Sequence, residues 1–363
     1  MKKQLPVQGK ATENLGTNIV LIRRKLNTPN LKLEFKELGT ETKTKICICY
    51  LENIANKKII EEVMRRLDKI EIDGILDAQY IQEIIKDAPL TPFRTTGYTE
   101  RPDIVVGKLL EGRVAIICDG TPVAITVPYI FVEYFNVNED YYNNYYYATV
   151  NRIIRWVGFL LASSVPAIYL ALVTYHQEML PTQLLLSISA SRQNVPFPTI
   201  VEAILMLFVF ELLRETSVRM PTVIGQTISI VGALVIGQAA VQAKLTSAPM
   251  IIVAALTGIT SFVVPKMQAE LIIIRLVFLM GAAFIGLYGY IFGVIGMFIH
   301  LASLRSFGIP YMLNIGAFRL ADMKDVMVRA PWYKMKSRPK LVVQQNRSRT
   351  ADNKETGDKV ENK

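Results

Sequence analysis

Hydrophobic and polar positions divide the chain into three parts. Up to about residue 147 apolar residues mix with charged ones, from 156 to 304 long uncharged runs dominate, and after 318 polar and basic residues return. A membrane-spanning helix needs about 20 apolar residues. The pattern therefore predicts an α/β N-terminal soluble domain (1–150), an all-α multi-span transmembrane domain (151–305) and a basic tail (306–363) that is disordered at its end.

Short periodic segments predict the elements of the first domain. Helical spacing covers residues 14–30, and Asn56 can cap a helix that reaches about Ile70. Residues 81–85 form a short helix. Strands are predicted at 44–51, 103–106, 113–118 and 123–127, joined by mixed strand connections.

Aromatic residues gather between residues 129 and 147, just before the first long apolar run. Rings at this place suit the headgroup region of a membrane. Stacking on nucleic acid would need interleaved basic residues, which are absent here. The segment is therefore predicted to form an interfacial aromatic belt.

The apolar runs predict four or six membrane crossings. The last run, Leu276–Leu304, exceeds the ~30 Å hydrocarbon core as one helix, so it must tilt, kink or fold into a hairpin near Gly286–Tyr290. Lys and Arg place both termini inside, which requires an even number of crossings. With six crossings, the last run forms a hairpin of two, and the other four are Trp156–Tyr175, Thr199–Met220, Thr222–Ala243 and Pro249–Val264. With four crossings, Thr199–Met220 lies in the interface and the last run crosses once.

A ladder of charges follows the helix predicted at Thr199–Met220. Glu211, Arg214, Glu215 and Arg219 recur at offsets of three and four, so opposite charges are neighbours. The ladder marks either an amphipathic interfacial helix or a functional charge network at a subunit contact or pore entrance. Glu202 stands alone early in this helix and is the better candidate for meeting an ion or a partner subunit.

Small and amide side chains mark the next apolar segments. Gly225, Ser229, Ala233 and Gly237 recur at every fourth position, and Gly289 and Gly293 form a GxxxG pair, so both rows are predicted to pack closely against other helices. Glutamines in the same region bridge helices or line a polar path. The candidate intramembrane network or pore is thus Glu202, Glu211, Arg214, Glu215, Arg219, Gln226, Ser229, Gln238 and Gln242.

Composition argues against several classes of function. The net charge of +10 fits cytoplasmic Lys and Arg around membrane segments rather than nucleic-acid binding. The three cysteines show no metal-ligand spacing, and the two histidines have no motif around them. We therefore expect no catalytic residue, no metal and no cofactor.

The most distinctive stretch begins PFPT at Pro196 and continues through ELLRETSVRMPTVIGQTISIVGALVIGQAAVQA. This stretch resembles the GerA family of spore germination proteins, specifically the A subunit of nutrient-germinant receptors. The resemblance extends to IDGILDAQYI (Ile72–Ile81), Pro128–Tyr134 and RSFGIPYM (Arg305–Met312).

The resemblance implies a membrane subunit rather than an enzyme. Members of this family lie in the spore inner membrane with a permease-like B subunit and a lipoprotein C subunit. They are thought to form a homo-oligomeric ring, a channel that releases monovalent cations. A secondary transporter or permease subunit is the alternative, although no internal repeat of the usual kind is visible. Gln8–Leu26 resembles the family's junction after a further hydrophilic subdomain, so we expect an N-terminally shortened member or a fragment of a split gene.

Overall fold

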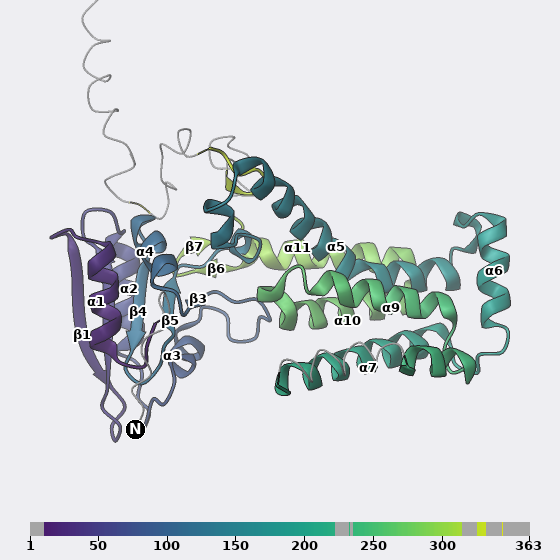
Figure 1. Ribbon diagram of the computed structural model, residues 1–363, viewed down its shortest axis with the longest axis horizontal. Coiled ribbons are helices and arrows are strands. Elements are labelled where there is room, and N and C mark those ends of the chain that lie inside the picture. The colour runs from purple at the N-terminus through teal and green to yellow at the C-terminus, as the bar shows by residue number, and fades with distance from the viewer. Residues whose placement is uncertain (1–10, 222–231, 233–234, 314–324, 332–342, 344–363) are drawn as a thin grey trace, which may run out of the picture. The chain divides into compact units, whose positions relative to one another are not determined.

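The computed structural model describes residues 11–221, 232, 235–313, 325–331 and 343 (Figure 1). Two compact units divide the chain. One comprises residues 1–149 with 301–363 and is called the sheet unit below. The other comprises residues 150–300 and is called the helical unit.

The sheet unit is built on an antiparallel sheet of five strands in the order β1-β2-β4-β5-β3. The predicted strand connections were wrong, because every neighbouring pair is antiparallel. Three predicted strands are confirmed, whereas β1 and β3 were not predicted. The bounds are β1 Leu31–Leu38, β2 Thr44–Leu51, β3 Gly97–Thr99, β4 Val114–Cys118 and β5 Ala124–Val127.

Helices cover both faces of this sheet (Figure 1). On one face α1 (Leu15–Lys25) and α4 (Pro102–Leu110) pack over Cys47 and Cys49. On the other face lie α2 (Lys57–Leu67) and α3 (Ala78–Ile85). The predicted cap of α2 is confirmed, since the Asn56 side chain accepts a hydrogen bond from the Lys58 amide at 3.1 Å.

The strand predicted at residues 103–106 was wrong, because this segment is the helix α4. Its β-branched residues favour a strand locally. Pro102 opens the helix, where a fixed φ and a missing N–H cost nothing, and Asp103 in the first turn suits the helix dipole. Val105 and Leu109, four residues apart, both enter the core, so packing overrides local propensity.

Asp103 predicts a pH dependence of the sheet unit. Burial raises the pKa of its carboxyl, but hydrogen bonds from Arg101 (2.9 Å) and Tyr142 (2.7 Å) outweigh that effect and lower the pKa to about 2. Because the folded pKa is depressed, the stabilisation is complete above the unfolded pKa, about 4, and is lost as the pH falls towards 2. Urea unfolding of wild type and Asp103→Asn should therefore differ at pH 7 and converge near pH 2. A constant gap would contradict this assignment.

The predicted aromatic belt was wrong in its first half, which lies in the core of the sheet unit. Tyr129, Phe131, Tyr134 and Phe135 are all buried. The Phe131 ring packs at 5.5 Å from Phe135 by ring centroids. These rings pack against one another and against other buried side chains. The first half of the segment is therefore internal rather than interfacial.

Residues that follow the last helix complete the sheet unit. β6 (Arg305–Ser306) and β7 (Ile309–Pro310) form a small hairpin. The Ser306 hydroxyl donates to the Thr95 carbonyl at 2.6 Å and accepts from the Tyr129 amide at 3.0 Å. Phe307 joins the core formed with α2 and α3. Residues 306–311, expected to open a basic tail, therefore pack inside the sheet unit, and the expected disordered end of the tail lies outside the described residues.

The helical unit consists of long apolar helices. Within the described residues, Tyr145–Thr174 and Pro265–Ile285 are long and apolar enough to cross a membrane by length and composition, whereas the apolar helices α9 and α11 are shorter. The bounds are α5 Tyr145–Thr174, α6 Thr182–Arg192, α7 Thr199–Arg219, α9 Ala248–Ser261, α10 Gln268–Ile285 and α11 Leu287–Ser303, and residues 235–242 are also helical. A multi-span membrane domain stays a prediction.

The last apolar run folds as two helices that meet at Gly286. This glycine has φ +64°, which an L side chain rarely adopts, so the chain can reverse there. The rings of Phe278 and Tyr290 lie 5.5 Å apart, and a Cβ at Gly289 would overlap the Gly281 carbonyl. Gly293 lies against Phe278. Of the three possibilities for this run, the structure has the hairpin.

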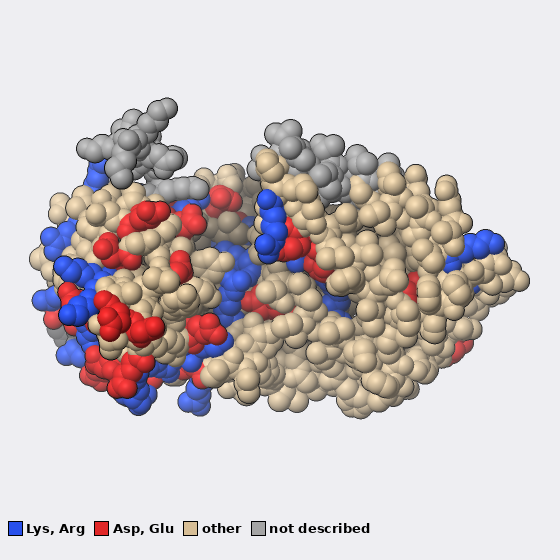
Figure 2. All heavy atoms as spheres, turned by 90° about the horizontal axis from the view of Figure 1, so that it is seen from below, with Lys and Arg blue, Asp and Glu red and all other residues tan. Residues whose placement is uncertain are grey.

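The two units differ in how many charged side chains they expose. Figure 2 shows Lys, Arg, Asp and Glu side chains spread over the sheet unit, while the visible surface of the helical unit is mostly uncharged. Large apolar side chains such as Phe284, Phe292 and Ile252 are exposed on the helical unit. Charged side chains inside this unit, including those of α7 and α10, therefore need explanation.

Candidate functional site

Glu202 is a buried carboxylate in the first turn of α7, with 1% of the residue exposed. Its Oε1 accepts hydrogen bonds from the Thr246 hydroxyl at 2.9 Å and from the hydroxyl and amide of Ser247. Ser247 is the N-cap of α9, so the negative charge lies at the positive end of a helix dipole. This arrangement joins the start of α7 to the start of α9.

The other oxygen of Glu202 is less well satisfied. The Arg192 Nε atom at the end of α6 lies 3.9 Å from Oε2, and within the described residues Oε2 accepts no hydrogen bond. A buried acceptor without a donor costs free energy. Oε2 is therefore the part of this carboxylate that has room for a further hydrogen-bond donor.

Glu211 is the centre of a second cluster. Its carboxylate lies 2.5 Å from Arg214 on the same helix and accepts from Arg275 of α10 at 3.2 Å. Arg275 also donates from Nε to the Ala162 carbonyl of α5 at 3.1 Å. Three helices thus meet at one cluster of charges, in which Arg275 is buried and Glu211 and Arg214 are half-buried. An isolated charge at membrane depth would cost ~3 kcal/mol or more, and pairing makes it tolerable.

The remaining ladder residues lie at the surface. Glu215 and Arg219 form an i,i+4 pair at 2.7 Å, and both side chains are exposed. Such pairs contribute little to stability. The structure therefore divides the predicted ladder into a half-buried part, Glu211 with Arg214, and an exposed part, Glu215 with Arg219.

The other predicted positions are placed as follows. Gln238 and Gln242 are exposed, and Gly237 is buried in ordinary contact with Ile251 of α9. Gln226, Ser229, Gly225 and Ala233 lie outside the described residues.

Sequence reasoning did not assign partners to these charges. Ser247 followed by Ala248-Pro249 is an N-cap pattern that could have marked the start of α9. Arg275, in the middle of the apolar helix α10, should have prompted a search for an acid on a neighbouring helix. Nothing in the spacing, however, links Glu202 to Thr246 or Glu211 to Arg275.

A third ionic cluster lies in the sheet unit. The buried Glu133 carboxylate accepts from Arg113, from Lys108 at 2.5 Å and from the Ile130 amide at 2.9 Å. Burial raises the pKa of Glu133, but the two cations outweigh it and leave the pKa below its usual range. Arg113 also donates to the Pro128 carbonyl. These contacts fix the chain that leads to α5, so the cluster is structural.

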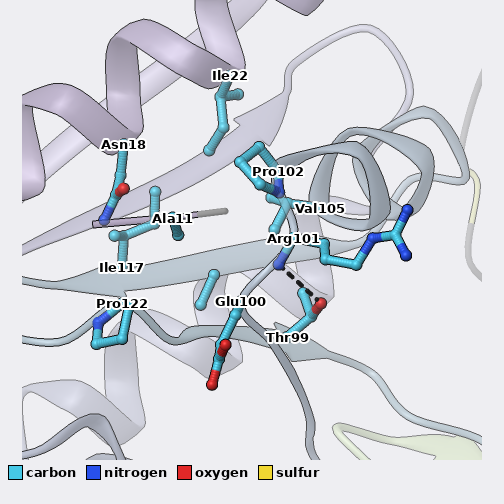
Figure 3. Close-up of a pocket in the computed structure, with 11 residues that line it drawn as sticks. Ala11, Asn18, Ile22, Thr99, Glu100, Arg101, Pro102, Val105, Ile117 and Pro122 are labelled. Atoms are coloured by element: carbon cyan, nitrogen blue, oxygen red, sulfur yellow. Dashed lines mark hydrogen bonds between the residues drawn. The ribbon is translucent and has the colours of Figure 1, made fainter. Parts of the chain in front are cut away.

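A small pocket of the sheet unit lies between α1 and α4 (Figure 3). Its lining is largely apolar, and the Arg101 guanidinium points away from it and bonds Asp103. Asn18 is already bonded to Thr12 through both side-chain atoms. Asn18 and Arg101 are thus already engaged, and within the described residues no group of His, Cys, Asp or Glu has metal-binding geometry.

Comparison with known proteins gives a family match along most of the chain. The model of the family described as Bacillus/Clostridium GerA spore germination protein matches residues 9–341. This range includes residues of both compact units.

Several curated proteins are similar to the chain. Spore germination protein KA of Bacillus subtilis (strain 168) is 48% identical over 95% of this chain and 63% of its own length. Spore germination protein B1 of the same organism is 41% identical over 90% of this chain and 68% of its own length. Spore germination protein GerLA of Bacillus cereus is 38% identical over 91% and 68%. The chain thus spans about two thirds of the length of these relatives.

One solved structure is similar in sequence to part of this chain. The crystal structure of the N-terminal domain of the A subunit of the Bacillus megaterium spore germinant receptor GerK3 is 46% identical over 34% of this chain and 98% of that chain, with a TM-score of 0.29.

Proposed function

The chain belongs to the GerA family of spore germination proteins, and from that premise we propose that it acts as the A subunit of a nutrient-germinant receptor. The observation that carries the proposal is the family match over residues 9–341. Relatives named spore germination proteins cover 90% or more of the chain. The proposed role is that of a receptor subunit rather than an enzyme.

The proposed location is the spore inner membrane, with both termini on the core side. Two apolar segments, Tyr145–Thr174 and Pro265–Ile285, support membrane insertion. The exposed apolar side chains of the helical unit suit lipid contact. Basic residues on both sides of the apolar region, including Arg152 and Arg305, support this orientation.

The proposed mechanism is ion release through a homo-oligomeric channel that works with a permease-like B subunit and a lipoprotein C subunit. The buried charge of Glu202 and the half-buried charge of Glu211 support this mechanism, because ionisable groups inside a membrane are expensive and mark ion paths or relays. Both carboxylates lie on α7, which would place them along one helix near the path.

The test uses spores whose A subunit is this chain alone, with potassium release measured after nutrient addition. Glu202→Gln and Glu211→Gln should slow or abolish release at normal protein levels, because each change removes a charge that is largely shielded from solvent but keeps the shape. Glu215→Gln is the matched control on the same helix, since that carboxylate is exposed. Normal release in both the Glu202→Gln and Glu211→Gln variants would refute the assignment of these residues. Saturable substrate exchange by the purified chain without partners would favour a transporter instead.

A further inference from the structure

Strand β1 forms the outer edge of the sheet (Figure 1). Among the described residues it pairs only with β2, so one row of backbone N–H and C=O groups has no strand beside it. The strand has eight residues, LKLEFKEL, and contains no proline. Phe35 in its middle is 62% exposed. A long edge strand with an exposed aromatic residue is a template for pairing with another strand.

Geometry limits how this edge can pair with a copy of itself. Along a strand, every second residue directs its N–H and C=O to the same edge. In an antiparallel pair, opposing residues both point towards each other or both point away. When two copies pair through the same edge, the numbers of any two opposing residues therefore add up to an even value. The two-fold axis then passes through a residue rather than between two residues.

Charge then selects among these registers. An axis at Glu34 or Lys36 would oppose like charges directly. An axis at Leu33 avoids this conflict but pairs only residues 31–35 and leaves residues 36–38 unpaired. An axis at Phe35 pairs residues 32–38 of the two copies. Phe35 then lies opposite Phe35 of the second copy, and the Glu34 of each copy lies opposite the Lys36 of the other. Opposite charges and aromatic pairs across strands are stabilising, whereas like charges are not.

We propose that β1 is a self-association surface, on which the β1 strands of two copies of this chain pair antiparallel with Phe35 facing Phe35. The sheet then continues from one copy into the other. Each Glu34 lies opposite a Lys36 of the second copy, and these two ion pairs fix the register.

Existing contacts of these charges are compatible with the pairing. Lys36 lies 2.5 Å from Asp68, and Glu34 accepts a hydrogen bond from the Tyr50 hydroxyl. An ammonium has three donors and a carboxylate has several acceptor positions, so each can take a further partner. Asp68 is largely exposed, which leaves Lys36 free to shift towards the second copy.

The proposed contact is two-fold, so it joins copies in pairs and is separate from the head-to-tail contacts that would close a ring. Its argument comes from the strand alone. Absence of the β1 contact in a chain that still supports potassium release would overturn the inference and leave the proposed function intact. Absence of potassium release in a chain that forms the β1 contact would do the reverse.

Cysteine cross-linking of the full chain in detergent tests the register. Glu34→Cys and Lys36→Cys proteins are purified separately, mixed and oxidised. We expect a disulfide-linked dimer in the mixture and little in either protein alone, because only the mixture places two thiols opposite each other. The three native cysteines are buried, so they do not compete. Absence of the mixed dimer, or equal cross-linking in each protein alone, would overturn the proposal.

Charge reversal provides the second test. Lys36→Glu places like charges opposite each other twice and should weaken β1 association about tenfold, measured as the yield of a Phe35→Cys dimer in a Cys47→Ala background. That background is needed because Phe35 lies opposite Cys47 on β2. The double change Glu34→Lys with Lys36→Glu should restore the yield. Equal yields in all three proteins, or cross-links from β1 to a different protein, would refute pairing with a second copy.

Discussion

Glu133→Ala is expected to lower the free energy of unfolding of the sheet unit by about 3–5 kcal/mol, because it leaves a buried guanidinium without its main counter-charge. Glu133 and Arg113 are 4% and 3% exposed. Arg113 would keep the Pro128 carbonyl and a carboxylate of Glu111 at 3.5 Å. Neither replaces the direct bond to Glu133.

Unfolding in urea at pH 7, followed by circular dichroism of the full chain in detergent, measures this effect. Glu139→Ala is the matched control, because Glu139 is exposed and lies 3.7 Å from Arg101. Its removal should cost less than about 1 kcal/mol. Glu133→Gln should fall between the two, since the amide keeps a hydrogen-bond acceptor without the charge. Equal stability of Glu133→Ala and Glu139→Ala would show that the buried cluster does not stabilise the sheet unit.

Local sequence patterns predicted most of the helices and strands whose pattern lies within a few residues. The strand Thr44–Leu51 and the helix capped by Asn56 are both present, because alternation and capping act within a few residues. α4 was missed because its β-branched residues favour a strand, whereas Pro102 favours the start of a helix. In β1 the alternation of Leu31, Leu33 and Phe35 with charged residues was present but was not used.

The candidate site was harder to predict because its bonds join distant positions. Glu202 meets Ser247, and Glu211 meets Arg275, across 45 and 64 positions. Helical spacing reveals only neighbours at offsets of three and four. It therefore indicated the pair of Glu211 and Arg214 but could not show which helix supplies the second cation. The same limit explains why the aromatic core around Phe131 was placed at a membrane surface.

Phe307→Ala is expected to destabilise the sheet unit by about 3–5 kcal/mol, the usual cost of removing a buried phenylalanine side chain. Phe307 is 4% exposed, and the Arg66 guanidinium lies 4.3 Å from its ring centroid. The Phe307 amide donates to Asp87 at 2.9 Å. Asp87 also binds Arg66 at 2.7 Å, so one residue from after α11 joins α2 to the segment after α3.

Two contributions to stability at Phe307 can be separated, that of the ring and that of the backbone conformation. Phe307 has φ +49°, in the region that glycine tolerates best. Phe307→Gly should therefore relieve backbone strain while losing the same ring, and it should be less destabilising than Phe307→Ala. Leu90→Ala serves as the control because Leu90 is 99% exposed.

Hydrogen exchange at the amides of β2 is the decisive measurement for Phe307. Ile46 and Ile48 of this strand belong to the same core cluster as Phe307. If the β6–β7 hairpin is part of one cooperative unit, Phe307→Ala should speed exchange at these amides as well as in the hairpin. Faster exchange confined to residues 305–311 would mean that the hairpin opens by itself. In that case the segment after α11 could detach while the sheet stays folded.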